Sequence, residues 1–128
     1  TFAALTAASL ALASCQTKDE KPTAKRDNSA AIAVLQRVNT GAQTCWVKSK
    51  DKAFRAYKVI PELDTRAGKP RILILKAKSA QGLPQYVIEA DGTPARLSTY
   101  GPLSSDPLSA RMNEDIARWR TGNKKCTA

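Results

Sequence analysis

The stretch RILILKAK at residues 71–78 decides the fold, because it is the most hydrophobic run of the region that can fold. Four large aliphatic residues follow one another at positions 72–75. Such a run predicts a strand that is buried on both faces and therefore lies inside a sheet. We expect the rest of the domain to be built around this strand.

Two other stretches predict its neighbours. FRAYKVIPEL at residues 54–63 is rich in aromatic and β-branched residues, and Pro61 favours an edge position or the end of that strand. QYVIEA at residues 85–90 predicts a third strand, which ends at an Asp-Gly turn signal. Residues 95–100 are the candidate for a short fourth strand. This order predicts an antiparallel meander of three to four strands.

A helix is expected before the first strand. Ser29 follows an asparagine suited to a helix N-cap, and apolar residues then recur at helical spacing to about Thr40. Gly41 either ends this helix or interrupts it. The stretch CWV at residues 45–47 fits a further helical turn or a short strand, and its periodicity does not decide between them.

A second helix is expected after the last strand. Asp106 is suited to its N-cap, Pro107 to its first position and Gly122 to the residue beyond its end. With both helices on one face of the meander, residues 29–128 predict a single α+β domain. The predicted core contains Leu35, Val38, Trp46, Tyr57, Val59, Ile72, Leu73, Ile74, Leu75, Val87, Ile88, Met112, Ile116 and Trp119.

Residues 1–14, TFAALTAASLALAS, form an apolar segment without a charge. It is shorter than the roughly 20 residues that a membrane-spanning helix needs. An apolar run that ends in small residues is typical of a secretory signal peptide near its cleavage site. Because no basic residue precedes it, we expect the numbering to begin inside the signal peptide.

The motif Leu12-Ala13-Ser14-Cys15 closes this segment and resembles the lipobox of bacterial lipoproteins. The resemblance implies cleavage before Cys15, lipidation of its thiol and attachment to a membrane. Gln16 at the next position implies the outer membrane, with the protein facing the periplasm. An ordinary signal peptide with a chance cysteine and a buried N-terminal helix are the alternatives.

Residues 16–28, QTKDEKPTAKRDN, contain no aromatic residue and no aliphatic residue larger than alanine. A segment of this composition does not bury enough apolar surface to order itself. We therefore interpret residues 15–28 as the lipidated cysteine and a flexible tether that reaches about 20 Å.

With Cys15 lipidated, Cys45 and Cys126 remain as an even pair. In an oxidising compartment such a pair predicts a disulfide, and two buried free thiols are the alternative. The chain contains no histidine, which is the commonest metal ligand and general base. Phosphate-binding glycine motifs are also missing from the sequence. We expect no metal site and no cofactor.

Lysine and arginine outnumber aspartate and glutamate by 21 to 11, which gives a formal net charge of +10. A balance this basic favours anionic partners such as lipid headgroups or acidic polymers. The densest basic run has a single acid, Asp51, and interleaved aromatic residues. The candidate surface for an anionic ligand consists of Lys48, Lys50, Lys52, Arg55 and Lys58.

Two interpretations of this run stay open. Basic residues among the aromatic residues Trp46, Phe54 and Tyr57 can form a binding platform. Alternatively, the aromatic side chains point into the core and the lysines keep a turn soluble. A periplasmic location argues against nucleic acid as the partner.

Catalytic patterns are weak. Ser79 lies beside two lysines, and three carboxylate pairs are close in sequence, but each fits a solvated strand end, turn or helix face. The pairs are Glu62 with Asp64, Glu89 with Asp91, and Glu114 with Asp115. The sequence therefore favours a non-catalytic binding or envelope-accessory domain whose partner is an envelope protein or an anionic glycolipid. The alternative is a hydrolase without histidine that acts on an envelope component.

Overall fold

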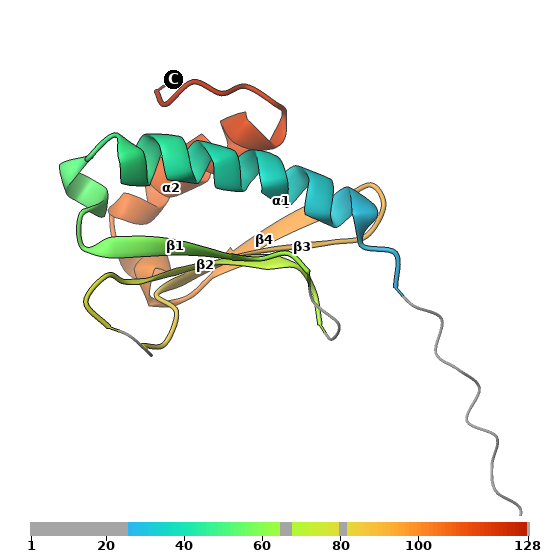
Figure 1. Ribbon diagram of the computed structural model, residues 1–128, viewed down its shortest axis with the longest axis horizontal. Helices are drawn as coiled ribbons and strands as arrows, with labels where there is room; N and C mark the ends of the chain where they lie inside the picture. Colours follow the sequence, from blue (N-terminus) through green and yellow to red (C-terminus); the bar gives the residue numbers. More distant parts are fainter. Residues whose placement is uncertain (1–25, 65–67, 80–81, 128) are drawn as a thin grey trace, which may run out of the picture.

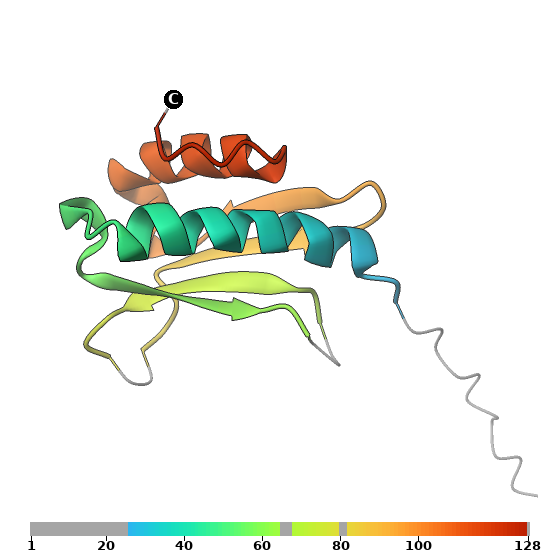
Figure 2. The ribbon, with the colours of Figure 1, turned by 45° about the horizontal axis from the view of Figure 1, so that its top comes forward.

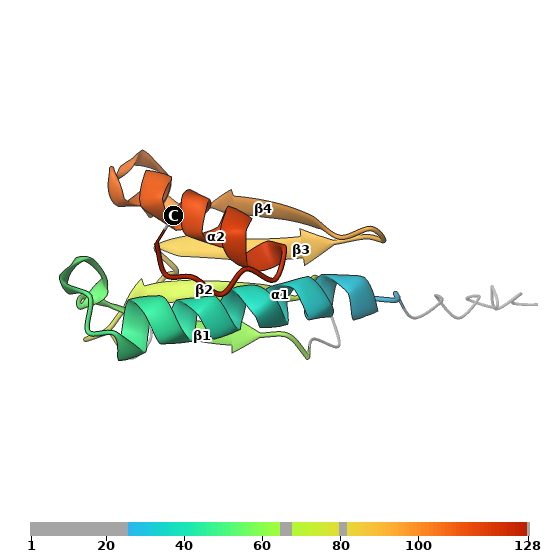
Figure 3. The ribbon, with the colours of Figure 1, turned by 90° about the horizontal axis from the view of Figure 1, so that it is seen from above.

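The computed structural model describes residues 26–64, 68–79 and 82–127 (Figure 1). The predicted signal peptide, Cys15 and most of the predicted tether lie outside these residues. The described chain forms a four-stranded antiparallel sheet with one helix from each end of the domain. Figures 2 and 3 show the two helices side by side over the same face of the sheet. This arrangement confirms the predicted α+β fold.

The sheet has the order β1-β2-β3-β4, so it is a simple meander. Its strands are β1 (Tyr57–Glu62), β2 (Arg71–Lys76), β3 (Tyr86–Asp91) and β4 (Arg96–Tyr100). The hydrophobic strand β2 pairs with β1 on one side and β3 on the other, as its composition predicts. Pro61 lies in the edge strand β1, opposite Ile72. An edge strand tolerates a proline because one side of its backbone has no partner strand.

The first helix, α1 (Ser29–Ala42), runs past the predicted end and continues into the π-helical turn η1 (Gln43–Lys48). The CWV stretch is therefore helical. Gly41 does not end α1. A Cβ atom on Gly41 would lie 2.2 Å from Cδ2 of Trp119, so a glycine is needed here for the close approach of the indole ring.

The last helix, α2 (Leu108–Arg120), follows the short 3-10 turn η3 (Pro102–Ser105). Oδ1 of Asp106 accepts a hydrogen bond from the backbone N–H of Leu108 at 2.8 Å, which is the predicted capping role. Gly122 has a φ of 95° directly after the helix, a conformation that glycine adopts at little cost.

The prediction of a strand from residue 54 is wrong at its beginning. Oδ1 of Asp51 accepts a hydrogen bond from the Ala53 N–H at 3.0 Å and starts the 3-10 turn η2 (Lys52–Phe54). Phe54 is buried and stacks on Trp46 with 4.7 Å between ring centroids. The aspartate cap and the burial of Phe54 outweigh the strand preference of these residues. The other strand limits lie within two residues of the predicted ones.

The main core lies between the sheet and the helices. Ile72, Ile74 and Ile88 face the helices, whereas Leu73 and Val87 are buried on the opposite face of the sheet. Tyr57, Val59 and Leu75 were predicted as core residues but are only half-buried. The predicted list also omitted eight hydrophobic residues that the structure buries: Ala31, Val34, Ala42, Cys45, Phe54, Tyr86, Ala90 and Leu103.

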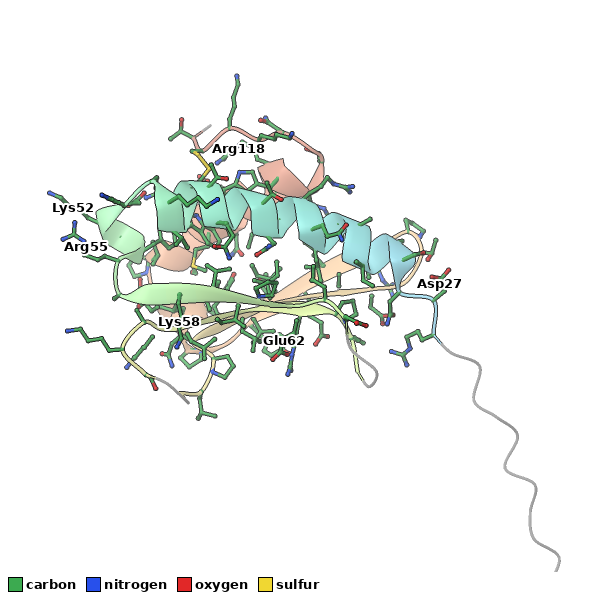
Figure 4. The ribbon with its side chains drawn as sticks, viewed as in Figure 1. Asp27, Lys52, Arg55, Lys58, Glu62 and Arg118 are labelled. Carbon is green, nitrogen blue, oxygen red and sulfur yellow. A yellow bond between two sulfur atoms is a disulfide. The ribbon has the colours of Figure 1, made fainter. Side chains whose placement is uncertain are left out.

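A disulfide joins Cys45 in η1 to Cys126 near the end of the chain, as the cysteine count predicts. The two Cα atoms are 5.2 Å apart although the residues are 81 positions apart in the sequence. The bond, drawn in yellow in Figure 4, fastens the segment after α2 to the end of the first helical unit.

Candidate functional site

The predicted basic run lies at one end of the domain, where η1 and η2 turn the chain toward β1. Lys48, Lys50, Lys52 and Arg55 are all exposed there. Lys50 has a φ of 58°, which lies in the left-handed region that residues other than glycine rarely adopt. Figure 4 shows Lys52 and Arg55 at the opposite end of α1 from Asp27.

Lys58 differs from the other members of the run, because it lies on β1 and is half-buried. Its Nζ atom donates a hydrogen bond to the carbonyl oxygen of Ser79 at 2.8 Å. The ammonium group is therefore directed at the turn after β2, on the face of the sheet that the helices leave open.

Two further cations join this end through strand pairing. Tyr57 lies opposite Lys76, and the Ala77 N–H donates a hydrogen bond to the Ala56 carbonyl at 2.8 Å. The exposed residues Lys76 and Lys78 therefore lie beside the start of β1. The sequence signal for this placement is the antiparallel pairing of the first two predicted strands, which brings the end of the second strand beside the start of the first. The basic end, as we define it, comprises Lys48, Lys50, Lys52, Arg55, Lys58, Lys76 and Lys78.

The aromatic residues of the run do not form a platform with these lysines. Trp46 and Phe54 are 2% and 3% exposed, and Tyr57 packs against the core cluster. A stacking surface needs ring faces that are open to a ligand. The basic end therefore offers charge and hydrogen-bond donors, and its aromatic rings belong to the core.

Asp51, the single acid among residues 48–58, is held by Arg111 of α2. Nη2 of Arg111 lies 2.5 Å from Oδ2 of Asp51, and the guanidinium also lies over the Phe54 ring, 5.2 Å from its centroid. The hydrogen bond from Arg111, followed by that from the Ala53 N–H, lowers the pKa of Asp51 below its ordinary value of 3.8. Asp51 stays ionised and its charge is balanced within the domain.

Asp115 is a buried carboxylate, although its pattern predicts a solvated position on the helix. It is 3% exposed and accepts a hydrogen bond from Nε1 of Trp46 at 2.8 Å. Arg118 donates to its other oxygen, and Nε of Arg111 lies 3.9 Å away. A buried carboxylate needs such partners because it loses its hydration. We call Asp51, Arg111, Asp115, Arg118 and Trp46 the α2 network.

Helical spacing was the signal for this burial. Asp115 lies three residues after Met112 and four before Trp119, so it falls on the same apolar stripe of α2. An acid on such a stripe predicts a buried partner. The tryptophan at the predicted end of the first helix supplies one.

The carboxylates proposed as catalytic pairs are mostly bound to basic side chains. Oε2 of Glu62 lies 2.7 Å from Nε of Arg71. Nζ of Lys69 lies 3.6 Å from Glu89 and 3.2 Å from Asp91, and its hydrogen bond lowers the pKa of Asp91. These contacts give the acids ion-pair partners. Asp64 and Glu114 are exposed, and Glu114 is adjacent to the buried Asp115.

The face of the sheet away from the helices carries a partly exposed apolar row. The pairing places Ile60, Leu73, Val87 and Tyr100 side by side across the four strands. Leu73 and Val87 are nearly covered, whereas Ile60 and Tyr100 are 39% and 45% exposed at the two edges. Tyr100 also donates a hydrogen bond to Glu89 at 3.2 Å.

Within the described ranges, no group of three or more metal-ligating side chains comes together, and no helix is long and apolar enough to cross a membrane. Comparison of the chain with protein-family models, with curated proteins and with solved structures finds no match.

Proposed function

We propose that this chain is a membrane-anchored periplasmic lipoprotein whose non-catalytic domain binds phosphate-bearing headgroups of the cell envelope. The proposed anchor is a lipid on Cys15 in the outer membrane, and it rests on the resemblance of residues 12–15 to a lipobox. The proposed binding surface is the basic end.

The clustering of cations at the basic end is the observation that carries the binding proposal. Two segments of the chain bring seven lysine and arginine side chains to this end. The charge of Asp51 is already balanced by Arg111 at 2.5 Å. Each lysine or arginine close to an anionic membrane surface contributes about 1 kcal/mol of binding free energy. A cluster of this size favours an anionic surface over a neutral one.

The position of the basic end also fits a tethered domain. Asp27 lies just before α1, while Lys52 and Arg55 lie at the other end of the helix (Figure 4). A helix of the 14 residues of α1 is about 21 Å long. The expected tether of about 20 Å is comparable to this length, so the domain can turn its basic end toward the membrane that holds the anchor.

The anchor is tested with Cys15→Ala in the full chain expressed in a Gram-negative bacterium. We expect the substituted protein to move from the membrane fraction to the soluble periplasmic fraction, because it loses the acyl chains that hold it. Thr17→Ala, two positions after the cysteine, serves as the neighbouring control and should leave the membrane partition unchanged. Unchanged membrane partition of the Cys15 variant would refute the anchor.

The binding surface is tested with the unlipidated Cys15→Ala chain and vesicles of phosphatidylglycerol or phosphatidylcholine at low salt. The chain with its native lysine and arginine residues should bind the anionic vesicles and should bind the neutral vesicles only weakly. The triple variant Lys48→Glu, Lys50→Glu and Lys52→Glu should bind at least about tenfold more weakly, given roughly 1 kcal/mol per lysine.

A matched control reverses three exposed cations outside the basic end and gives the same change in net charge. These are Arg26, Arg96 and Arg120. If binding depends on the basic end, the control variant keeps most of its affinity. Equal losses in the two triple variants would show that net charge alone drives binding and would contradict the proposed surface.

A protein partner on the open face of the sheet is the second candidate function, because Ile60 and Tyr100 are exposed there. Crosslinking in the intact envelope with the wild type and with Ile60→Ser and Tyr100→Ser tests it. A crosslinked protein that disappears with these substitutions supports this candidate, and an unaffected crosslink pattern argues against it.

A further inference from the structure

A groove runs along the outer side of α1, separate from the basic end. Figure 3 shows the segment after α2 returning alongside α1, and the groove lies between the two. Its volume of about 460 Å³ lies within the range of roughly 300–1,000 Å³ that is common for small-molecule sites. Its lining includes Ala33, Gln36, Arg37 and Thr40 of α1 and, on the other side, Asn123 and Lys124.

Small residues on α1 leave this space open. Ala33 has a short exposed side chain, and Gly41 has none, so that the Trp119 ring can pack directly beneath the groove. The Trp119 ring packs against the bare backbone at Gly41, with its Nε1 donating to the Lys125 carbonyl at 2.9 Å. The ring therefore supplies a rigid apolar part of the lining, while its polar atom is already bonded to the wall.

The wall opposite α1 is fixed in place. Cys126 is bonded to Cys45, and Nε of Arg37 donates a hydrogen bond to the Arg120 carbonyl at 3.0 Å. Oδ1 of Asn123 accepts a hydrogen bond from the Lys125 N–H at 3.1 Å. A wall held by a covalent bond and several hydrogen bonds needs little ordering when a ligand binds, which favours affinity.

The charge of the lining has one sign. Arg37 and Lys124 are cationic, and the other lining residues are neutral. Among the described residues, neither cation has an ion-pair partner within 4.0 Å. The bond from Nε to the Arg120 carbonyl orients the Arg37 guanidinium and leaves its two Nη groups for an anion.

We propose that this groove binds a small polar molecule that carries an anionic group, either a carboxylate or a phosphate. Arg37 binds the anion through two parallel hydrogen bonds, and Lys124 adds a second positive charge. The amide and hydroxyl groups of Gln36, Thr40 and Asn123 contact the polar body of the ligand.

The test is an NMR titration of the isotope-labelled Cys15→Ala chain with two anionic probes and their neutral counterparts. Succinate is compared with succinamide, which has no carboxylate, and glycerol 3-phosphate is compared with glycerol. We expect the backbone signals of residues 33–44 and 119–124 to shift with at least one anionic probe and not with its neutral counterpart. The probe that acts identifies the anion as carboxylate or phosphate.

Two substitutions test separately the charge of Arg37 and the open volume of the groove. Arg37→Gln should weaken binding of the effective probe about tenfold or more, because charge-assisted hydrogen bonds are lost. Ala33→Trp fills the groove at an exposed position and should abolish binding with both cations still present. Arg96→Gln, on β4, is the matched charge control and should leave the titration unchanged.

The vesicle assay keeps this proposal distinct from that for the basic end. Ala33→Trp should bind phosphatidylglycerol vesicles like its parent, and the triple lysine variant should still bind the small probe in the groove. The groove proposal is overturned if neither anionic probe shifts these signals, if the neutral probes act equally, or if Ala33→Trp retains full probe binding.

Discussion

The α2 network and the basic end both consist of charged side chains, but their surroundings are opposite. Asp115 is 3% exposed and bonds to Trp46 and Arg118. Lys48, Lys50 and Lys52 are exposed, and none has an ion-pair partner within the described parts of the chain. This difference indicates that the partnered charges stabilise the fold, whereas the unpartnered ones are available to a ligand.

The largest loss of stability is expected when the most buried charged residue, Asp115, is replaced. Asp115→Ala leaves the Trp46 N–H without its acceptor and Arg118, whose side chain is 14% exposed, without its partner. Removing one member of a buried ion pair costs about 3–5 kcal/mol. Urea unfolding of the full chain should show a loss of this size.

The neighbouring residue provides the control for Asp115. Glu114 is exposed, and Glu114→Ala should change the free energy of unfolding by less than about 0.5 kcal/mol. If both substitutions cost the same, the α2 network has no special role in stability and the comparison fails.

The disulfide is expected to have the next largest effect. Replacing Cys45 and Cys126 with serine opens a link between residues 81 positions apart, which should lower the free energy of unfolding by about 2–4 kcal/mol. Thermal and urea unfolding of the wild type in a reductant should give a matching loss. A loss below about 1 kcal/mol would mean that noncovalent contacts, such as that of Trp119 with the Lys125 carbonyl, hold the wall of the groove by themselves.

Features that depend on residues close in the sequence could be predicted from it, whereas features that depend on residues far apart in the sequence could not. The four strands, both helices and the cap at Asp106 follow from local patterns, and the structure agrees with them. The bond of Asp115 to Trp46 and that of Asp51 to Arg111 required tertiary packing, because these partners are 69 and 60 positions apart in the sequence. Only the folded chain brings η1 and η2 against α2.

The candidate sites show the same division. The basic run was visible in the sequence, but the contribution of Lys76 and Lys78 appears only when the strands are paired. The groove was not predicted at all, since its two walls come from α1 and from the segment after α2. No local pattern connects Ala33 or Arg37 with Lys124.

Asp51 lies between the two extremes of the comparison, and its effect should depend on pH. Its pKa is below 3.8 in the folded chain because of Arg111 and the Ala53 N–H. Its stabilising contribution is therefore complete well above pH 3.8 and is lost as the pH falls through the folded-state pKa. Asp51→Asn should cost about 1 kcal/mol or less at pH 7, because the Arg111 side chain is 39% exposed.

Urea unfolding of the wild type and Asp51→Asn at pH 7 and near pH 2 tests this dependence. The difference between the two proteins should shrink at the lower pH, and the exposed Asp64→Asn should show no comparable difference at either. A difference that is independent of pH would show that the Asp51 side chain acts through hydrogen bonds that the neutral amide also makes.

Lys50 gives the smallest expected effect and the opposite sign. Its φ of 58° disfavours any side chain, so Lys50→Gly relieves strain of about 1–2 kcal/mol. The added freedom of glycine in the unfolded chain offsets about 0.4–1 kcal/mol of this relief. A net gain of about 0.5 kcal/mol is expected in urea unfolding, together with weaker binding to phosphatidylglycerol vesicles. A gain in stability together with weaker vesicle binding would show that Lys50 contributes to ligand binding and lowers the stability of the fold. A loss of stability would instead mean that the lysine makes contacts that support the turn.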